Sequence, residues 1–170
     1  GRTKTLSIGF PDTTSIEVMA AHLKQTLASL VADESVNLDK GVDLVTHSMG
    51  GIVARLALED VSFAAHIHTL VTLATPHEGT HLARYIHSMK IKELRPESEL
   101  LRRLSKQMPF HKNPDMPRLI CFWTPKDLIL LPPKSAVATG AESMCIPDAS
   151  HLGFLLKPKV WDKIFECLAR

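Results

Sequence analysis

Short apolar runs alternate along this chain with longer segments in which apolar residues recur every three or four positions. The clearest longer segment is 15–32, where Ile16, Met19 and Leu23 begin a stripe that continues with the spacing of an amphipathic helix. The short runs have the length and apolar content of buried strands. The whole pattern predicts strands over 3–8, 42–46, 68–74, 118–123 and 143–146, and helices over 15–32, 50–60, about 133–140 and 157–168. Strands that alternate with helices predict an α/β fold with a mostly parallel sheet flanked by helices.

The segment of about 80–112 interrupts this alternation and is rich in basic residues. Lysine and arginine gather between Lys90 and Lys112, and Leu94, Leu100 and Leu104 recur on one side of an amphipathic pattern. The ordinary interpretation is a set of helices with a solvated face. The alternative is a helical cap over a site, which could make transient contact with an anionic lipid surface. We therefore expect a single domain over 1–170 with a cap insertion at about 80–112.

The hexapeptide THSMGG at 46–51 lies between a predicted strand and a predicted helix. A serine in this setting is typical of a nucleophile elbow, in which a strained turn exposes Ser48 and directs the helix N-terminus at the reacting carbonyl. The turn brings the residues two positions before and after the serine together, which favours small residues. Gly50 fits, and Thr46 stands where the pattern G-x-S-x-G has its first glycine. The alternative is that Ser48 only caps the following helix.

A carboxylate and a histidine follow Ser48 in the order that such an elbow requires, Ser, then Asp or Glu, then His. Asp127 comes just after a predicted strand, and His151 lies in a later loop. His151 would take the proton from Ser48, and Asp127 would orient the imidazole and stabilise its charged form. Asp115 precedes its strand, and Asp148 is too close to His151 in sequence to be its usual partner. The sequence therefore predicts a Ser48, His151, Asp127 triad.

We expect the other histidines to be ordinary surface or half-buried side chains. His47 is next to the nucleophile, and the geometry of an elbow predicts that it points away. The others with this interpretation are His22, His66, His68, His81, His87 and His111.

Several blocks of the sequence resemble bacterial-type lipases and esterases of the α/β-hydrolase superfamily. The blocks are the elbow, LVTLATPHEGT at 70–80, LRPESELLRRL at 94–104, Asp127, and HLG at 151–153. The second block is the most specific, because it is similar to the strand and turn that follow the elbow helix in relatives of the triacylglycerol lipases. Its alternative interpretation is a strand ended by a proline turn. The likeness runs from about residue 15 to the C-terminus.

This resemblance implies an α/β-hydrolase fold and hydrolysis of lipid or other small hydrophobic acyl esters through an acyl-enzyme on Ser48. It also implies that the backbone N–H of Met49 is one oxyanion donor. No residue spacing suggests a zinc or iron site and no glycine-rich loop suggests a nucleotide, so we expect no cofactor or metal. The candidate residues of the substrate pocket are His47, Thr75, Pro76, Leu128 and Leu152. A thioesterase or an amidase would use the same machinery.

One part of the family pattern is missing from the sequence. Relatives carry, before the elbow, a strand that ends in a His-Gly turn and supplies the second oxyanion donor, and nothing between Gly1 and Thr46 matches it. We therefore expect an N-terminally incomplete fold, and a catalytically weak or inactive binding module is the alternative function. A rival interpretation takes Ser7 to Phe10 as a degenerate oxyanion turn, with the N–H of Phe10 near Ser48.

Composition agrees with one globular domain of ordinary type. The chain has 170 residues, of which 45% are hydrophobic, and a formal net charge of +2, which argues against nucleic-acid binding. Of the three cysteines, Cys121 and Cys145 fall in predicted core strands. We expect them and Cys167 to be buried free thiols, with a bridge between Cys121 and Cys145 as the alternative. No apolar run is long enough to span a bilayer, no signal-peptide pattern is present, and the oligomeric state stays open.

Overall fold

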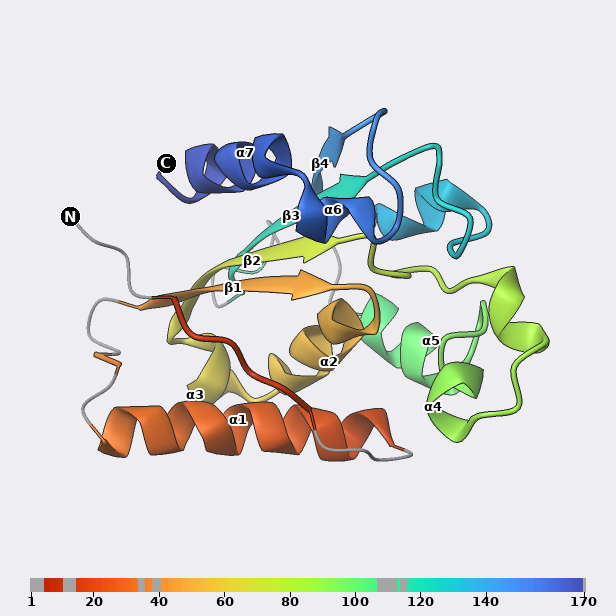
Figure 1. Cartoon of the computed structure of the whole chain (residues 1–170). Coiled ribbons are helices and arrows are strands. Elements are labelled where there is room, and N and C mark those ends of the chain that lie inside the picture. The colour runs from red at the N-terminus through yellow and green to blue at the C-terminus, as the bar shows by residue number, and fades with distance from the viewer. Residues whose placement is uncertain are drawn as a thin grey trace.

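The computed structural model of the chain describes residues 5–10, 15–33, 36–37, 41–106, 113 and 116–169. These residues contain a four-stranded parallel sheet with the order β1, β2, β3, β4 (Figure 1). The strands are β1 (Val42–His47), β2 (Ile67–Leu73), β3 (Arg118–Trp123) and β4 (Glu142–Cys145). The parallel sheet predicted from the sequence is therefore confirmed.

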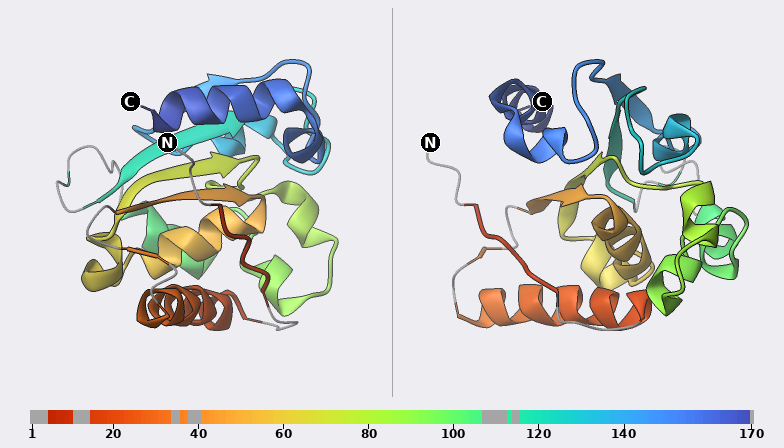
Figure 2. Two further views of the ribbon diagram at one scale, coloured as in Figure 1. Left: turned by 60° about the vertical axis from the view of Figure 1, so that its left-hand side comes forward. Right: turned by 45° about the vertical axis from the view of Figure 1, so that its right-hand side comes forward.

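Helices cover both faces of this sheet, as the alternating pattern predicts. On one face lie α1 (Ile16–Ala32), α2 (Met49–Ala57) and α3 (Val61–Ala64), and on the other lie α6 (Gly153–Leu156) and α7 (Pro158–Leu168) (Figures 1 and 2). The 3-10 helix η2 (His81–Arg84), α4 (Met89–Lys92) and α5 (Glu99–Ser105) follow β2, and the 3-10 helix η4 (Pro133–Ala136) follows β3. Within the described part of the chain, no helix has the length and apolar content needed to cross a membrane.

The apolar core is divided into two layers by the sheet. Leu70 and Leu119 belong to the layer under α1 and α2, whereas the next residue of each strand, Val71 or Ile120, belongs to the layer under α7. Successive side chains of a strand point to opposite faces, so the strand backbone itself produces this division. All four side chains are buried, which explains why the central strands read as continuous apolar runs in the sequence.

The strand expected over 3–8 does not form in the part of it that the structure describes. Residues 5–8 pair with no strand, and 3–4 lie outside the described residues. Ile8 and Phe10 instead pack against the core layer under α1, and the Nε2 atom of His22 lies 3.2 Å from the carbonyl oxygen of Gly9. The apolar side chains that suggested a strand are used for packing against a helix, and β1 is an edge strand of the described sheet.

Two of the predicted helices are shorter than expected. The helix expected over 50–60 ends at Ala57, and Asp60 then caps α3 by accepting hydrogen bonds from the N–H groups of Ser62 and Phe63. The helix expected at about 133–140 forms only as the short η4. Gly140, at the end of the expected range, has a left-handed φ of +75°. Helix α6 lies in a segment where the sequence pattern predicts no helix.

The cysteines differ from expectation at one position. Cys121 and Cys167 are buried free thiols, as predicted, but the free thiol of Cys145 is exposed. The prediction of burial is wrong for Cys145 because β4 is an edge strand, which the sequence pattern does not reveal. In the β3–β4 ladder Cys121 pairs with Ser143, so the two cysteines are out of register and no disulfide joins them.

A buried arginine connects α2 to α5 and to the turn after β2. The side chain of Arg55 is 2% exposed. Its Nη2 donates to the carbonyl oxygen of Leu104 at 2.6 Å, and its Nη1 donates to Nδ1 of His77 at 3.1 Å. Burial lowers the pKa of Arg55 to about 10, so the guanidinium is still charged at neutral pH. The charged side chain of Arg55 therefore connects three segments, namely α2, α5 and the turn after β2.

The protonation state of His77 follows from its partners. An arginine can only donate, so Nδ1 of His77 accepts and its proton is on Nε2, which donates to Oγ1 of Thr72 at 3.0 Å. Burial lowers the pKa of His77 well below its usual value, and the positive charge of Arg55 lowers it further. His77 is therefore a neutral, fixed tautomer in the core.

We expect Arg55→Met to lower the free energy of unfolding by about 2–4 kcal/mol, because it leaves the Leu104 carbonyl and Nδ1 of His77 buried without their donor. Urea denaturation followed by circular dichroism measures this change. The matched control is Arg102→Met on the exposed side of α5, which we expect to change the unfolding free energy by less than about 0.5 kcal/mol. Equal effects of the two substitutions would contradict the role given to Arg55.

Candidate active site

Ser48 occupies a strained turn between β1 and α2. Its φ is +53° and its ψ is −128°, a left-handed backbone that residues other than glycine rarely adopt. The N–H of Ser48 donates to the carbonyl of Leu73 at 2.8 Å, and the hydroxyl of Thr75 donates to the carbonyl of Ser48, also at 2.8 Å. The turn is thus fixed at both ends by residues at the end of β2, and it has the geometry expected of a nucleophile elbow.

The residues on either side of Ser48 lie close together, as expected for this turn. A Cβ atom added at Gly50 would lie 3.7 Å from Cβ of Thr46, so the positions on either side of the serine do approach each other. At Gly51 an added Cβ would lie 2.3 Å from Oγ1 of Thr75, which is too close for two non-bonded atoms. Gly51 therefore lets Thr75 reach the Ser48 carbonyl.

The structure brings Ser48, His151 and Asp127 together, although more than a hundred residues separate the first two in sequence. Nε2 of His151 lies 3.1 Å from Oγ of Ser48, and Nδ1 of His151 lies 2.8 Å from Oδ2 of Asp127. Ser48 follows β1, Asp127 follows β3, and His151 follows β4. The carboxyl ends of parallel strands meet at one edge of a sheet, which explains why three distant segments converge there.

The Asp127 carboxyl is stabilised in its charged form. Burial raises its pKa, but hydrogen bonds from His151 and from the N–H groups of Leu130 and Ile129 act in the opposite direction, and the net effect is a lowered pKa. A carboxylate here can only accept, so the proton of the neutral imidazole is on Nδ1 of His151. Nε2 of His151 is then the acceptor that faces the Ser48 hydroxyl.

The loops that carry Asp127 and His151 are tied to each other. The hydroxyl of Thr124 donates to the carbonyl of Ala149 at 3.0 Å, and it accepts the N–H of Lys126 at 3.2 Å. Sequence reasoning missed Thr124, since a threonine after a strand carries no distinctive signal. Of the competing carboxylates, Asp148 is exposed and lies near Lys126, whereas Asp115 lies outside the described residues.

His47 does not point away from the site, which corrects the expectation from the elbow geometry. Its Nε2 lies 2.8 Å from the carbonyl oxygen of His151, and the two imidazole rings pack edge to face with centroids 4.9 Å apart. Strand alternation explains this position: Leu44 of β1 packs under α1, so His47, an odd number of residues away, points to the opposite face. The alternation in β1 is the sequence signal that would have placed His47 correctly.

The four candidate pocket residues other than His47 fall into two groups. Thr75 and Pro76 are buried, and Thr75 supports the elbow through its hydrogen bond to Ser48. Leu128 and Leu152, the residues after Asp127 and His151, are 81% and 62% exposed. These exposed leucines flank the triad, and the role of all four residues toward a substrate stays a prediction.

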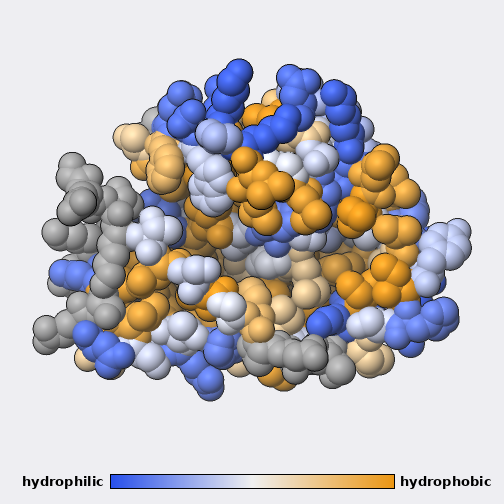
Figure 3. Space-filling model, in the orientation of Figure 1, coloured by the Kyte–Doolittle hydropathy of each residue, from blue (hydrophilic) through white to orange (hydrophobic). Residues whose placement is uncertain are grey.

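Exposed apolar side chains are frequent on this face of the molecule. Figure 3 shows apolar surface over the region of α6 and over the segments that follow β2 and β3. The exposed large apolar residues of these segments are Tyr85, Ile86, Met89, Leu128, Ile129, Leu131, Leu152, Leu155 and Leu156. Clusters of this kind on one face are a common sign of an interaction surface.

Cavities occur both along the edge of β1 and on the side of α1 that faces α4 and α5. One of about 210 Å³ lies along the open edge of β1, and Ile8, Phe10, His47 and Gly50 are among its lining residues. Because Gly9 contacts His22 of α1, the turn at Ser7 to Phe10 is held against that helix. The interpretation of this turn as an oxyanion donor stays a prediction.

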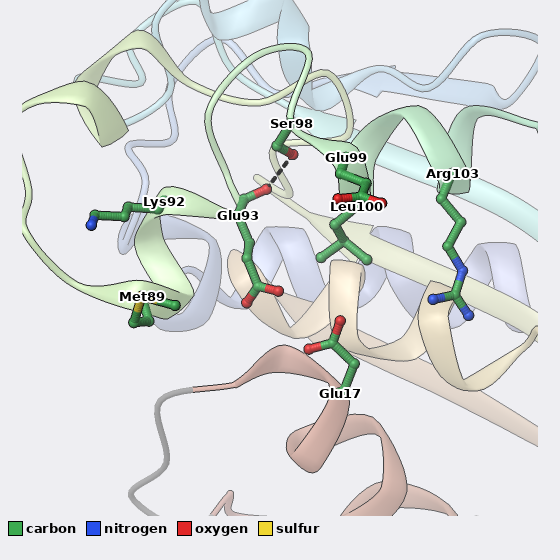
Figure 4. Close-up of a pocket in the computed structure, with 8 residues that line it drawn as sticks. All are labelled: Glu17, Met89, Lys92, Glu93, Ser98, Glu99, Leu100 and Arg103. Carbon is green, nitrogen blue, oxygen red and sulfur yellow. Dashed lines mark hydrogen bonds between the residues drawn. The ribbon is translucent and has the colours of Figure 1, made fainter.

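A second cavity, of about 430 Å³, lies between the first turn of α1 and the helices α4 and α5 (Figure 4). The carboxylates of Glu17 and Glu93 point toward each other across it, and the N–H of Ile16 donates to Glu93 at 3.3 Å. Burial raises the pKa of Glu93, and the negative charge of Glu17 raises it further. None of the triad residues lines this cavity. Among the described residues no three His, Cys, Asp or Glu side chains form a group that could hold a metal ion.

The solved structures that align with this chain include two lipases and a phospholipase. Phospholipase PlaB from Legionella pneumophila aligns with a TM-score of 0.55 and 18% identity, over 71% of this chain and 30% of that one. Aspergillus fumigatus lipase B aligns with a TM-score of 0.70 and 14% identity, over 92% of this chain and 42% of that one. The mature form of Bacillus licheniformis lipase BlEst2 aligns with a TM-score of 0.64 and 17% identity, over 90% of this chain and 72% of that one. The chain therefore has the α/β-hydrolase fold of lipases and esterases, and it spans less than half the length of the first two proteins.

The sequence family of this chain is narrower than the class of proteins that share its fold. The profile of the PGAP1-like alpha/beta domain matches residues 15–100, about half of the chain, and the chain belongs to this family. A comparison with curated proteins gives no match. The resemblance to α/β-hydrolases found in the sequence is thus confirmed.

We expect Gly51→Ala to lower the free energy of unfolding by about 1–3 kcal/mol, because the new methyl group displaces Thr75 and breaks its hydrogen bond to Ser48. The matched control is Gly50→Ala, where the added methyl meets only an ordinary contact, and we expect a change of less than about 1 kcal/mol. Urea denaturation of both variants measures the difference. Equal stability of the two variants would show that the space at Gly51 is not needed.

Proposed function

We propose that this chain is a serine ester hydrolase that acts on lipid or other hydrophobic acyl esters. The observation that carries the proposal is the alignment of three groups: the Ser48 hydroxyl on a strained turn, Nε2 of His151 at 3.1 Å, and the Asp127 carboxylate at 2.8 Å from Nδ1. A hydroxyl that only capped α2 would need neither partner. The side chain of Ser48 in fact makes no capping hydrogen bond to α2.

The reaction proceeds by two acyl transfers in this proposal. Oγ of Ser48 attacks the ester carbon as its proton moves to Nε2 of His151, and the carbonyl electrons form an oxyanion. Collapse of this intermediate breaks the bond to the alcohol, which takes the proton from His151 and leaves an acyl-Ser48. Water repeats the sequence with His151 as base, and it releases the carboxylic acid and free Ser48.

The oxyanion is stabilised at the N-terminus of α2. Met49 is the first residue of this helix, so its backbone N–H lies beside the nucleophile, where the positive end of the helix dipole favours a negative charge. With a single oxyanion donor, turnover is roughly 10²- to 10³-fold slower than with two donors. A slow hydrolase is therefore the expected form of this activity if Met49 acts alone.

The substrate class rests on the surface around the triad and on the neighbours in fold. Leu128 and Leu152 place apolar side chains directly beside Asp127 and His151, which suits an acyl chain or another apolar group. Two of the similar structures are named lipases and one is named a phospholipase. A thioester or an amide would meet the same groups, so these substrates are the alternatives.

We expect Ser48→Ala to reduce the hydrolysis of p-nitrophenyl butyrate by at least about a thousandfold, because it removes the attacking oxygen. A fluorophosphonate probe, detected by mass spectrometry, is expected to label Ser48 in the folded protein and to leave the alanine variant unlabelled. Ser29→Ala, at an exposed serine on α1 away from the triad, is the control and is expected to keep the probe reaction. Failure of the probe to label the unmodified, folded protein would favour the binding module.

The exposed apolar residues near the site also favour a transient contact with a lipid surface. Lys126, Lys134 and Lys157 are exposed on the same loops and helices as Leu128 and Leu156, so apolar and basic side chains occur together. This combination suits an anionic membrane, because the leucines enter the headgroup region while the lysines contact lipid phosphates.

We expect the chain to sediment with vesicles that contain phosphatidylglycerol more strongly than with vesicles of phosphatidylcholine alone. Leu128→Ser is expected to weaken this binding by about tenfold, since it removes one apolar anchor. Val61→Ser is the control, because Val61 is an equally apolar, exposed residue on α3, away from the triad. Equal binding of both variants, or of both kinds of vesicle, would contradict a specific contact.

A further inference from the structure

We infer that His47 is a positioning residue for the base of the triad: it holds the backbone of His151 in register with Ser48. This inference rests on the proposed function, since it concerns the same site. It assigns a role to a residue that touches neither the nucleophile nor the acid through its side chain. The observation is the contact between Nε2 of His47 and the carbonyl oxygen of His151 at 2.8 Å.

The direction of this hydrogen bond is fixed by its chemistry. A carbonyl oxygen only accepts, so Nε2 of His47 carries a proton and donates it. Burial lowers the pKa of His47, and the nearby His151 lowers it further, while the hydrogen bond to the His151 carbonyl and the charge of Asp127 act in the opposite direction. The net effect is a lowered pKa, so at neutral pH His47 is uncharged, with its proton on Nε2.

Within the described residues, the side-chain hydrogen bonds on either side of His151 join its loop to segments other than β1. Before His151, Ala149 is held by the hydroxyl of Thr124, and after it the N–H of Gly153 donates to the hydroxyl of Ser150. Neither of these bonds links the loop to β1. The bond from His47 does so, at the carbonyl of the base itself, and His47 is adjacent to Ser48 in the chain. The side chain next to the nucleophile therefore binds the backbone of the base directly, and this bond helps to set the distance between Ser48 and His151.

The ring of His47 also restrains the imidazole of His151. The two rings meet at an interplanar angle of 60° with centroids 4.9 Å apart, the edge-to-face arrangement that aromatic rings favour. This contact limits rotation of the His151 ring about its side-chain bonds. During acyl transfer His151 becomes positively charged, and an uncharged neighbour opposes that charge less than a cationic one would. A neutral His47 thus supplies a hydrogen-bond donor and an aromatic ring without adding a second positive charge beside His151.

Two substitutions separate the hydrogen bond from the ring contact. His47→Phe keeps an aromatic ring beside His151 but has no donor, and His47→Gln keeps an N–H donor of similar reach but has no ring. If the hydrogen bond is the positioning element, glutamine retains most of the function and phenylalanine does not. A purely space-filling role would give the opposite order.

The first measurement is the state of the histidine rings, and it needs no catalysis. In protein labelled with ¹⁵N-histidine, long-range ¹H–¹⁵N spectra distinguish the two neutral tautomers of each imidazole. We expect the Nε2–H tautomer for His47 and the Nδ1–H tautomer for His151 in the unmodified protein. In His47→Phe we expect the two ring nitrogens of His151 to shift toward averaged values, and in His47→Gln we expect them to stay as in the unmodified protein.

The second measurement is the rate at which the fluorophosphonate probe labels Ser48. We expect His47→Phe to be about tenfold slower and His47→Gln to stay within about threefold of the unmodified protein, with KM for p-nitrophenyl butyrate unchanged in both. The Nδ1–H tautomer of His47 in the unmodified protein, or an unchanged His151 spectrum in His47→Phe, would overturn the inference. If the tautomers are as expected but the unmodified protein is not labelled, the proposed hydrolase function fails and the spectra alone decide the role of His47.

Discussion

The site depends on one constraint, the left-handed backbone of Ser48. A residue with a side chain resists a φ of +53°, at a cost of order 1–3 kcal/mol, so its neighbours must hold it there. The carbonyl of Leu73 binds the N–H of Ser48, and the hydroxyl of Thr75 binds its carbonyl, both at the end of β2. Parallel pairing of β1 with β2 thus supports the turn, and Gly51 provides the space that Thr75 needs.

The same turn determines where the residues on either side of the serine point. His47 still belongs to β1, so strand alternation directs it to the face where the His151 loop packs. Met49 already belongs to α2, so its amide lies at the helix N-terminus. Asp127 and His151 reach the same edge because each follows a strand of one parallel sheet, and Thr124 connects their loops. The chemistry of the site is therefore a consequence of sheet topology more than of local sequence.

Much of this could be predicted from the sequence, and the failures have identifiable causes. Residues 118–123 form the predicted strand, and its four middle residues are the buried apolar run that predicts it. The approach of Ser48, Asp127 and His151 to one another could be predicted because each lies in a segment that follows a strand of the parallel sheet. Patterns of apolar residues do not say what an apolar side chain packs against, so residues 3–8 suggested a strand although Ile8 packs against the core layer under α1. These patterns also do not reveal edge strands, so they predict burial for Cys145 although it is exposed on β4. Contacts between distant polar groups, such as Arg55 with His77, leave no local signal at all.

Helix α2 joins the two halves of this arrangement. Its first residue, Met49, offers the amide beside Ser48, and two turns later Arg55 holds α5 through the Leu104 carbonyl. The guanidinium of Arg55 donates to the neutral imidazole of His77 and to the Leu104 carbonyl. His77 belongs to the turn that follows Thr75, so the segment that supports the Ser48 carbonyl is anchored to α2 from both sides. The placement of the nucleophile and the attachment of the segment after β2 therefore rest on the same nine-residue helix.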